Sequence, residues 1–257
     1  MIASRRMDRG RSVRLEAGTA SHTGLIRASN QDSVGLVEGL YVVADGMGGH
    51  RGGEVASAEA VAAMLSMFDR RDRAGLVSAV RSANRTILEM TVTRPDLSGM
   101  GTTLCALAVA NSASGDEVLA VANIGDSRVY RFAAGELVQV SDDHSLVADL
   151  MRAGELTAEE AAQHPQRNIL TRALGIEADP VIDSWELEPA LGDRYLLCSD
   201  GLFNELDDGR LAEVLAAGSV QETADRLVDE AVENGGHDNV TVLVLEVVAG
   251  PEAREDR

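Results

Sequence analysis

The sequence lacks lysine altogether, because all 23 of its basic residues are arginine. Without lysine, the chain cannot contain the phosphate-binding lysine of a Walker-A loop, the strand lysine of a protein kinase or a Schiff-base nucleophile. The arginines are also outnumbered by 42 acidic residues, which gives a formal net charge of −19. A charge of this sign and size repels a phosphate backbone, so we expect no nucleic-acid partner.

Cysteines and long apolar runs are also scarce. Cys105 and Cys198 are the two cysteines, and each lies inside an apolar run rather than in a metal-binding or disulfide spacing. Isolated thiols suit a reducing compartment, so we expect a cytoplasmic protein. Apolar stretches such as residues 104–110 are far shorter than the ~18 residues that a membrane span requires. We therefore expect no membrane span.

The apolar pattern groups strands together and helices together. Strands are predicted at residues 40–44, 103–110, 117–123, 127–132, 136–140 and 240–248, and helices at 54–68 and 72–92. Capping-box patterns at 157–160 and 219–222 predict two further helices. Because the elements do not alternate one for one, we expect an α+β fold with antiparallel sheets. We expect a loose N-terminal extension at 1–15, one domain at 16–249 and a loose tail at 250–257.

Aspartates stand at the ends of several predicted strands. Asp45 and Asp200 each follow an apolar strand and precede a glycine, and Asp126 follows a third strand. Asp32 and Asp238 stand just before strands. One such aspartate is most often a turn former, but packed sheets can bring all five carboxylates to one rim. Gathered carboxylates need a neutralising cation, and oxygen ligands favour Mg²⁺ or Mn²⁺.

Other hydrolase and nucleotide-binding patterns are missing. Cys198 is not followed by the arginine-terminated phosphate loop of a cysteine phosphatase, and Ser127 lacks the second glycine of a serine-hydrolase motif. The glycine-rich residues 46–53 match neither the Walker nor the dinucleotide fingerprint. No histidine has a metal-ligand spacing, so we expect structural or surface roles for all five. They are His22, His50, His144, His164 and His237.

A series of short motifs follows in order along residues 20–248. The motifs are RASNQD at 27–32, VADGMGGH at 43–50, GTT at 101–103, GDSR at 125–128, DHS at 143–145, LTRALG at 170–175, CSDGL at 198–202 and DNVT at 238–241. This series resembles the PPM (protein phosphatase 2C) family, and most of all its compact bacterial Ser/Thr phosphatases.

The resemblance implies both a fold and an activity. The fold is a four-layer α-β-β-α sandwich, in which helices flank two central antiparallel sheets and a metal cluster lies at one edge. The activity is that of a metal-dependent protein serine/threonine phosphatase, in which a hydroxide bridging two metal ions attacks phosphorus directly. The substrates would be phosphoserine and phosphothreonine proteins, the targets of a cognate Ser/Thr kinase, and we expect the enzyme to be a monomer.

The resemblance also implies a ligand set for two core ions, Mn²⁺ or Mg²⁺, and a weaker third. Asp45 would bridge the two core ions, and Gly46 would offer its backbone carbonyl to one of them. Asp200 and Asp238 would complete the shell of the other. Asp126, together with Asp200, matches the site of the third ion.

Three further assignments follow from the resemblance. Asp32 would act through water held by the metal, and Arg27 would grip the substrate phosphate. Arginine suits this role because its planar fork offers two parallel donors, which lysine does not. Residues 146–168 would form the variable flap beside the active site.

Two positions depart from the family pattern. Gln31 stands where the family often has glutamate, so a neutral amide replaces a water-holding carboxylate. Met47 follows Gly46 where some eukaryotic relatives have a histidine, a candidate general acid. The group that protonates the leaving serine is therefore left open, with water on the metal as the default donor.

A catalytically silent relative that binds phosphoproteins is the alternative function. Such a protein should have lost metal ligands, whereas the predicted ligands Asp45, Asp126, Asp200 and Asp238 are all present. Turnover of a small phosphate ester discriminates between the two functions.

Overall fold

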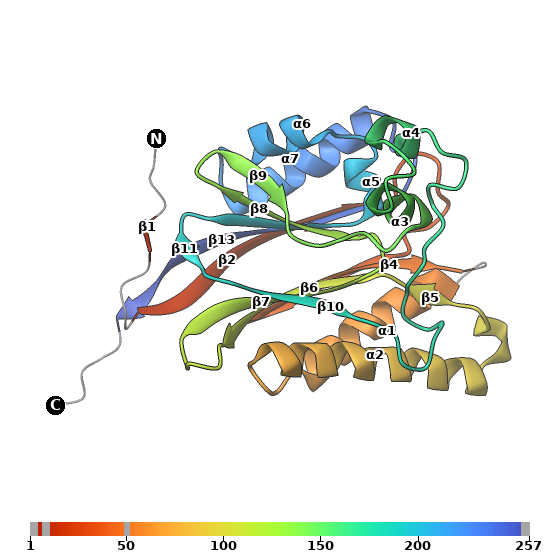
Figure 1. The fold of residues 1–257 in the computed structure, drawn as a ribbon, viewed down its shortest axis with the longest axis horizontal. Coiled ribbons are helices and arrows are strands. Elements are labelled where there is room, and N and C mark those ends of the chain that lie inside the picture. The colour runs from red at the N-terminus through yellow and green to blue at the C-terminus, as the bar shows by residue number, and fades with distance from the viewer. Residues whose placement is uncertain (1–4, 7–10, 49–51, 253–257) are drawn as a thin grey trace.

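The computed structural model describes residues 5–6, 11–48 and 52–252. They form two antiparallel sheets packed face to face, with helices on both outer faces (Figure 1). This arrangement confirms the α+β, four-layer α-β-β-α sandwich that the resemblance implies.

The first sheet has five strands, all antiparallel to their neighbours. In pairing order they are β2 (Arg11–His22), β13 (Val240–Glu252), β12 (Arg194–Cys198), β8 (Arg128–Ala133) and β9 (Glu136–Gln139).

The second sheet follows the order β10 (Asp183–Leu187), β7 (Glu117–Ile124), β6 (Leu104–Asn111), β4 (Leu40–Met47) and β3 (Asp32–Val37). A short strand, β5 (Gly101–Thr102), also pairs with β4. Apart from these sheets, β1 (Arg5–Arg6) pairs with β11 (Ala190–Leu191).

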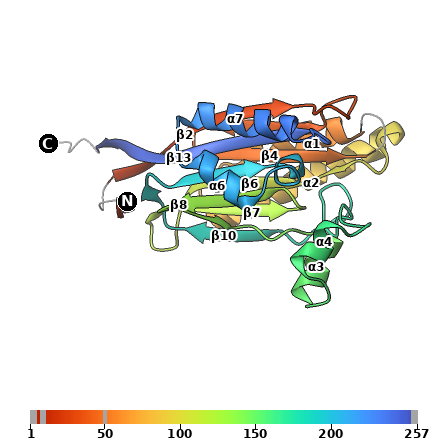
Figure 2. The ribbon, with the colours of Figure 1, turned by 90° about the horizontal axis from the view of Figure 1, so that it is seen from above.

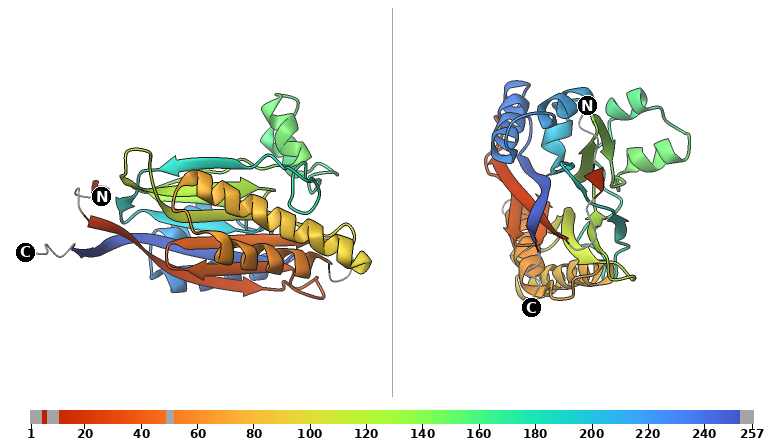
Figure 3. Two further views of the ribbon diagram at one scale, coloured as in Figure 1. Left: turned by 90° about the horizontal axis from the view of Figure 1, so that it is seen from below. Right: turned by 90° about the vertical axis from the view of Figure 1, so that its left-hand side faces the viewer.

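Helices cover the outer faces of both sheets. The second sheet is covered by α1 (Gly52–Met67) and α2 (Arg73–Thr93), followed by the 3-10 turn η1 (Pro95–Leu97). The first is covered by α5 (Asp200–Phe203), α6 (Asp208–Leu215) and α7 (Val220–Glu233). The short helices α3 (Leu146–Arg152) and α4 (Ala158–Ala162) project from the layers, as Figures 2 and 3 show. Not one described helix combines the length and apolar character that a bilayer crossing demands.

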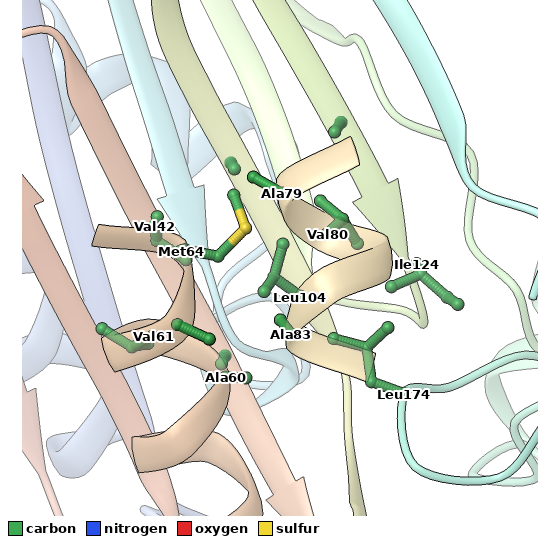
Figure 4. Close-up of a cluster of buried hydrophobic side chains, with 14 of the residues drawn as sticks. Val42, Ala60, Val61, Met64, Ala79, Val80, Ala83, Leu104, Ile124 and Leu174 are labelled. Carbon is green, nitrogen blue, oxygen red and sulfur yellow. The ribbon is translucent and has the colours of Figure 1, made fainter. Parts of the chain in front are cut away.

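Strand β4 shows why the fold has layers. Side chains alternate across a strand, so Val42 faces the α1 and α2 layer while Val43 faces the opposite sheet. Both are fully buried, which explains the uninterrupted apolar run in this segment. Figure 4 shows Val61 and Met64 of α1 packed in the outer cluster that includes Val42. The burial of both faces fixes the register of β4, and with it the position of the aspartate near its end.

The expected loose ends are wrong where they overlap two long strands. Strand β2 begins at Arg11, inside the expected extension at 1–15, and β13 continues to Glu252, inside the expected tail at 250–257. These strands pair along nearly their whole lengths. Leu15 is buried between the sheets, so its burial and the backbone pairing outweigh the polar composition of the segment. Residues 1–4, 7–10 and 253–257 lie outside the described part of the chain.

Candidate active site

A pocket of about 870 Å³ gathers residues from both sheets. Asp45 and Gly46 come from the end of β4, and Asp126 from the turn that follows β7. Asp200 follows β12, and Asp238 precedes β13. Four predicted aspartates and the predicted glycine therefore line one pocket, as expected for strand ends in packed sheets. Arg27, in the loop between β2 and β3, also lines it.

Asp32 lies behind this lining rather than in it. It begins β3 and is the direct cross-strand neighbour of Asp45. The Ser199 hydroxyl donates to Asp32 Oδ2 at 2.7 Å, and the same hydroxyl accepts from the Thr241 N–H at 2.9 Å. Asp32 Oδ1 is buried with no hydrogen-bond partner in the described structure. A buried carboxylate oxygen of this kind needs a polar partner such as water or a cation.

Asp32 and three of the pocket carboxylates have raised pKa values. The pKa rises to about 6 at Asp32 and Asp126, to about 8 at Asp200, and well above its usual value at Asp45. Burial, which disfavours the charged form, is the main cause in each case. Repulsion by neighbouring aspartates adds to it at Asp45 and Asp200. The pocket therefore concentrates more negative charge than its surroundings neutralise, and a cation would reverse these shifts.

Arg27 and Asp238, which were expected to have separate roles, form an ion pair. Arg27 Nη2 lies 2.6 Å from Asp238 Oδ2, and this hydrogen bond raises the pKa of Arg27. The other oxygen, Asp238 Oδ1, accepts from the Asn239 N–H at 2.8 Å. Both carboxylate oxygens of Asp238 thus contact protein donors. Nothing in the motifs indicates this pair, which joins residues 211 positions apart.

Asn239 fastens the loop that carries Arg27. Its side-chain nitrogen donates to the backbone oxygens of Thr23 at 2.8 Å and Ser29 at 3.0 Å. Its side-chain oxygen accepts from the Gln31 N–H at 2.8 Å. Asn239 is buried, so one amide group holds both ends of the loop. The DNVT motif contains this residue, but its position there does not reveal what the side chain binds.

Gly46 is required by a close approach between chain segments. A Cβ atom at this position would collide with the backbone carbonyl of Gly53 and lie 2.6 Å from the Gln31 carbonyl oxygen. The start of α1 therefore packs against the backbone of Gly46. Any larger residue would push α1 away from the end of β4, which carries Asp45.

His144 supports the turn that carries Asp126. Its Nδ1 accepts from the Gly125 N–H at 3.1 Å, and its Nε2 lies 3.0 Å from Asp183 Oδ2. The side chain is 1% exposed, and burial lowers its pKa. Gly125 has a φ of +98°, which permits the turn. His144 therefore has a structural role.

The other histidines lie elsewhere. His22 and His237 are exposed, His164 is partly buried, and His50 lies outside the described residues.

The described side chains do not form a ready-made metal site. No group of three or more His, Cys, Asp or Glu residues in the described ranges is arranged to hold an ion. Two contacts turn carboxylates toward protein donors: Asp238 Oδ2 pairs with Arg27, and the Asn204 side chain donates to Asp200 Oδ2 at 3.2 Å. The pocket lining and the raised pKa values still show that the carboxylates are close enough to repel one another.

Comparisons with known proteins show which family the chain is similar to. The sequence model of the family described as Protein phosphatase 2C matches residues 26–234. The serine/threonine protein phosphatase PstP of Mycobacterium tuberculosis is 43% identical over 239 residues, which cover 91% of this chain and 45% of PstP. The chain thus spans about half the length of that relative. The serine/threonine phosphatase Stp of Listeria monocytogenes is 38% identical, over 87% of this chain and 92% of Stp.

Solved structures extend the comparison. The crystal structure of M. tuberculosis PstP superposes with a TM-score of 0.83 at 43% identity, covering 91% of this chain and 99% of that one. The catalytic domain of PstP in complex with two manganese ions superposes with a TM-score of 0.81 at 41% identity, covering 92% of this chain and 100% of that one. With the family model matching most of its length, the chain belongs to the protein phosphatase 2C family.

Proposed function

We propose that the chain is a metal-dependent protein serine/threonine phosphatase that hydrolyses phosphoserine and phosphothreonine. The observation that carries this proposal is the set of four aspartates that line one pocket with Arg27. The PstP domain that binds two manganese ions and the match over 92% of Listeria Stp support it.

The residues fit Mn²⁺ or Mg²⁺. Their donor atoms are carboxylate and carbonyl oxygens, which these hard ions prefer. Asp45 would bridge two core ions, with the Gly46 carbonyl on one and with Asp200 and Asp238 on the other. Asp126 would hold a weaker third ion together with Asp200. The raised pKa values at the pocket support this assignment, because a cation relieves the repulsion that contributes to them.

Asp32 would orient water for the reaction. Its unpartnered Oδ1 is available as an acceptor, while Ser199 holds Oδ2 in place. Two divalent ions, when bound, lower the pKa of water so that it can attack phosphorus near neutral pH. Gln31 would contribute a neutral amide where relatives often place a carboxylate.

Arg27 would bind the substrate phosphate. Its side chain is 55% exposed, so it can contact an incoming phosphate without any rearrangement of the core. Its partner in the free protein is Asp238, and the phosphate competes with that carboxylate for the same guanidinium. A planar guanidinium can donate to two phosphate oxygens at once, which orients the phosphorus for attack from the opposite side.

Residues 146–168 would form a flap beside the pocket, and Asn168 at the end of this segment lines the pocket. We propose a reducing compartment such as the cytoplasm, because Cys105 and Cys198 are buried free thiols. Targets of a cognate kinase would be the substrates. The intact set of aspartates in the pocket favours catalysis over a silent phosphoprotein-binding role.

The test is turnover of p-nitrophenyl phosphate and of a phosphothreonine peptide, with Mn²⁺ and with a chelator. We expect activity only with the metal, and a large loss in Asp238→Asn. Asp229→Asn is the matched control, because Asp229 is exposed on α7. Equal rates with and without metal would contradict the metal-dependent mechanism. Stoichiometric metal binding without turnover of either substrate would favour the silent alternative.

A further inference from the structure

Exposed apolar side chains line part of the same pocket as the carboxylates. Ile176 and Val181 line the pocket and are 53% and 61% exposed. We call residues 176–181 the apolar rim; they lie in the coil between α4 and β10, which runs beside α2 in Figure 1. Single exposed apolar residues are ordinary, but two together at the edge of a candidate active-site pocket suggest a binding surface.

The backbone of the rim is fastened from α2. The Asn84 side-chain nitrogen donates to the Glu177 backbone oxygen at 2.8 Å, and its side-chain oxygen accepts from the Gly175 N–H at 2.8 Å. Asn84 is 1% exposed, so these bonds are shielded from water. Hydrogen bonds to α2 therefore hold the backbone of the rim in place, in addition to the chain connections at the two ends of the segment.

A second anchor lies just before the rim. Leu174 is fully buried and exchanges two backbone hydrogen bonds with Thr102, at 2.9 and 3.1 Å. Gly175 has a φ of +85°, and a Cβ there would lie 2.7 Å from the Ile87 side chain and 2.8 Å from the Met100 oxygen. The chain thus turns sharply against the core before it presents Ile176.

The combination of fixed backbone and exposed apolar side chains is the basis of the inference. A pre-positioned surface loses little conformational entropy when a ligand covers it. The rim is also continuous with the pocket that holds Arg27 and the aspartates. A ligand that contacted both regions would place a phosphate near Arg27 and the aspartates and a large apolar side chain on the rim.

The charges on the rim narrow the class of ligand. Glu177 and Arg172 both line the pocket. The side chain of Asp179 is 85% exposed, and its Oδ1 lies 3.7 Å from Arg81 Nε. The chain as a whole carries a net charge of −19. Acidic residues beside the phosphate would therefore be repelled, whereas apolar neighbours would not.

We propose that the apolar rim selects phosphoprotein segments with a large apolar residue next to the phosphorylated serine or threonine. Ile176 and Val181 receive that apolar side chain while Arg27 receives the phosphate. This inference rests on the proposed phosphatase function and adds a substrate class to it. A small phosphate ester has no flanking residue to place on the rim, so it serves as the reference substrate.

The test uses three phosphothreonine peptides that differ only in the flanking residues: leucine, serine or aspartate on both sides. For each enzyme variant, kcat/KM for a peptide is divided by kcat/KM for p-nitrophenyl phosphate. We expect wild type to prefer the leucine over the serine peptide roughly tenfold, since burying a large apolar side chain supports about that factor. The aspartate peptide should be the poorest substrate.

Val181→Ser and Ile176→Ser should reduce the preference for leucine over serine to roughly twofold. Val138→Ser is the matched control, because Val138 is 50% exposed on β9 and does not line the pocket. It should keep the wild-type ratio. A wild-type ratio near one, or an equal loss in Val138→Ser, would overturn the inference.

A second measurement separates this inference from the proposed function. Fluorescence anisotropy of labelled peptides reports binding whether or not turnover occurs. If wild type hydrolyses neither peptide nor p-nitrophenyl phosphate, the proposed function fails. Tighter binding of the leucine peptide, weakened in Val181→Ser but not in Val138→Ser, would still support the rim. Equal binding of the leucine and serine peptides would contradict it.

Discussion

Two loops border the pocket, and each is held by a buried asparagine from a distant part of the chain. Asn239 fastens the loop of Arg27, and Asn84 fastens the apolar rim. The loops differ in what they present: a guanidinium on one side, Ile176 and Val181 on the other. An asparagine suits both positions, because its amide can donate to one backbone group and accept from another. The same anchoring device thus supports two different recognition chemistries.

Removing the charge from the first loop should have the largest effect. Arg27→Ala deletes the donor proposed for the phosphate and leaves Asp238 without its ion-pair partner. We expect kcat/KM to fall about 100-fold for both p-nitrophenyl phosphate and peptides, chiefly through KM. Steady-state kinetics check this, with Arg85→Ala on the exposed face of α2 as the control. Unchanged KM and kcat in Arg27→Ala would remove the assigned role.

Releasing the first loop should have the next largest effect. Asn239→Ala removes three hydrogen bonds that span the loop of Arg27. We expect a destabilisation of about 3 kcal/mol and a fall of about tenfold in kcat/KM for every substrate. Urea unfolding measures the destabilisation, and steady-state kinetics measure the fall in kcat/KM. Asn239→Asp keeps the acceptor but not the donors, so an intermediate result would show which bonds matter.

Releasing the second loop should affect peptides more than small esters. Asn84→Ala leaves the Gly175 N–H and the Glu177 carbonyl oxygen without their partner. We expect this change to lower the free energy of unfolding by about 2 kcal/mol. We expect kcat/KM for the leucine-flanked peptide to fall about fivefold relative to p-nitrophenyl phosphate. Asn111→Ala, at an exposed position, is the control. If both substrates lost activity equally, the two loops would not have separate tasks.

The carboxyl groups at and behind the pocket lining should make the free energy of unfolding depend on pH. The folded-state pKa values of Asp32, Asp126 and Asp200 are raised above the usual value to about 6, 6 and 8. The folded state therefore holds more protons than the unfolded state between about pH 4 and 8, and stability falls as pH rises through that window. In chelator, Tm should be a few degrees lower at pH 8 than at pH 5.5. Mn²⁺ should reduce the difference, and Asp200→Asn should reduce it in chelator.

Much of the secondary structure could be predicted from local patterns. The capping box at Ser219 and Glu222 forms with both reciprocal contacts, and so does the one at Thr157 and Glu160. The apolar run of β4 also appears as predicted. Such features depend on residues within a few positions of one another, so the sequence displays them directly. Strand β2 was missed because its pairing with β13, more than 200 residues away, stabilises it more than its own composition does.

The candidate site was also partly visible in the sequence. The apolar runs indicated which carboxylates stand at strand ends, and Asp45 directly follows one such run. The pairing of Arg27 with Asp238, and the hydrogen bonds by which Asn84 and Asn239 hold the two loops, depend on the packing of the whole fold. Those contacts join segments 91 to 216 positions apart. They depend on how the packed sheets and helices bring those segments together, which no local pattern encodes.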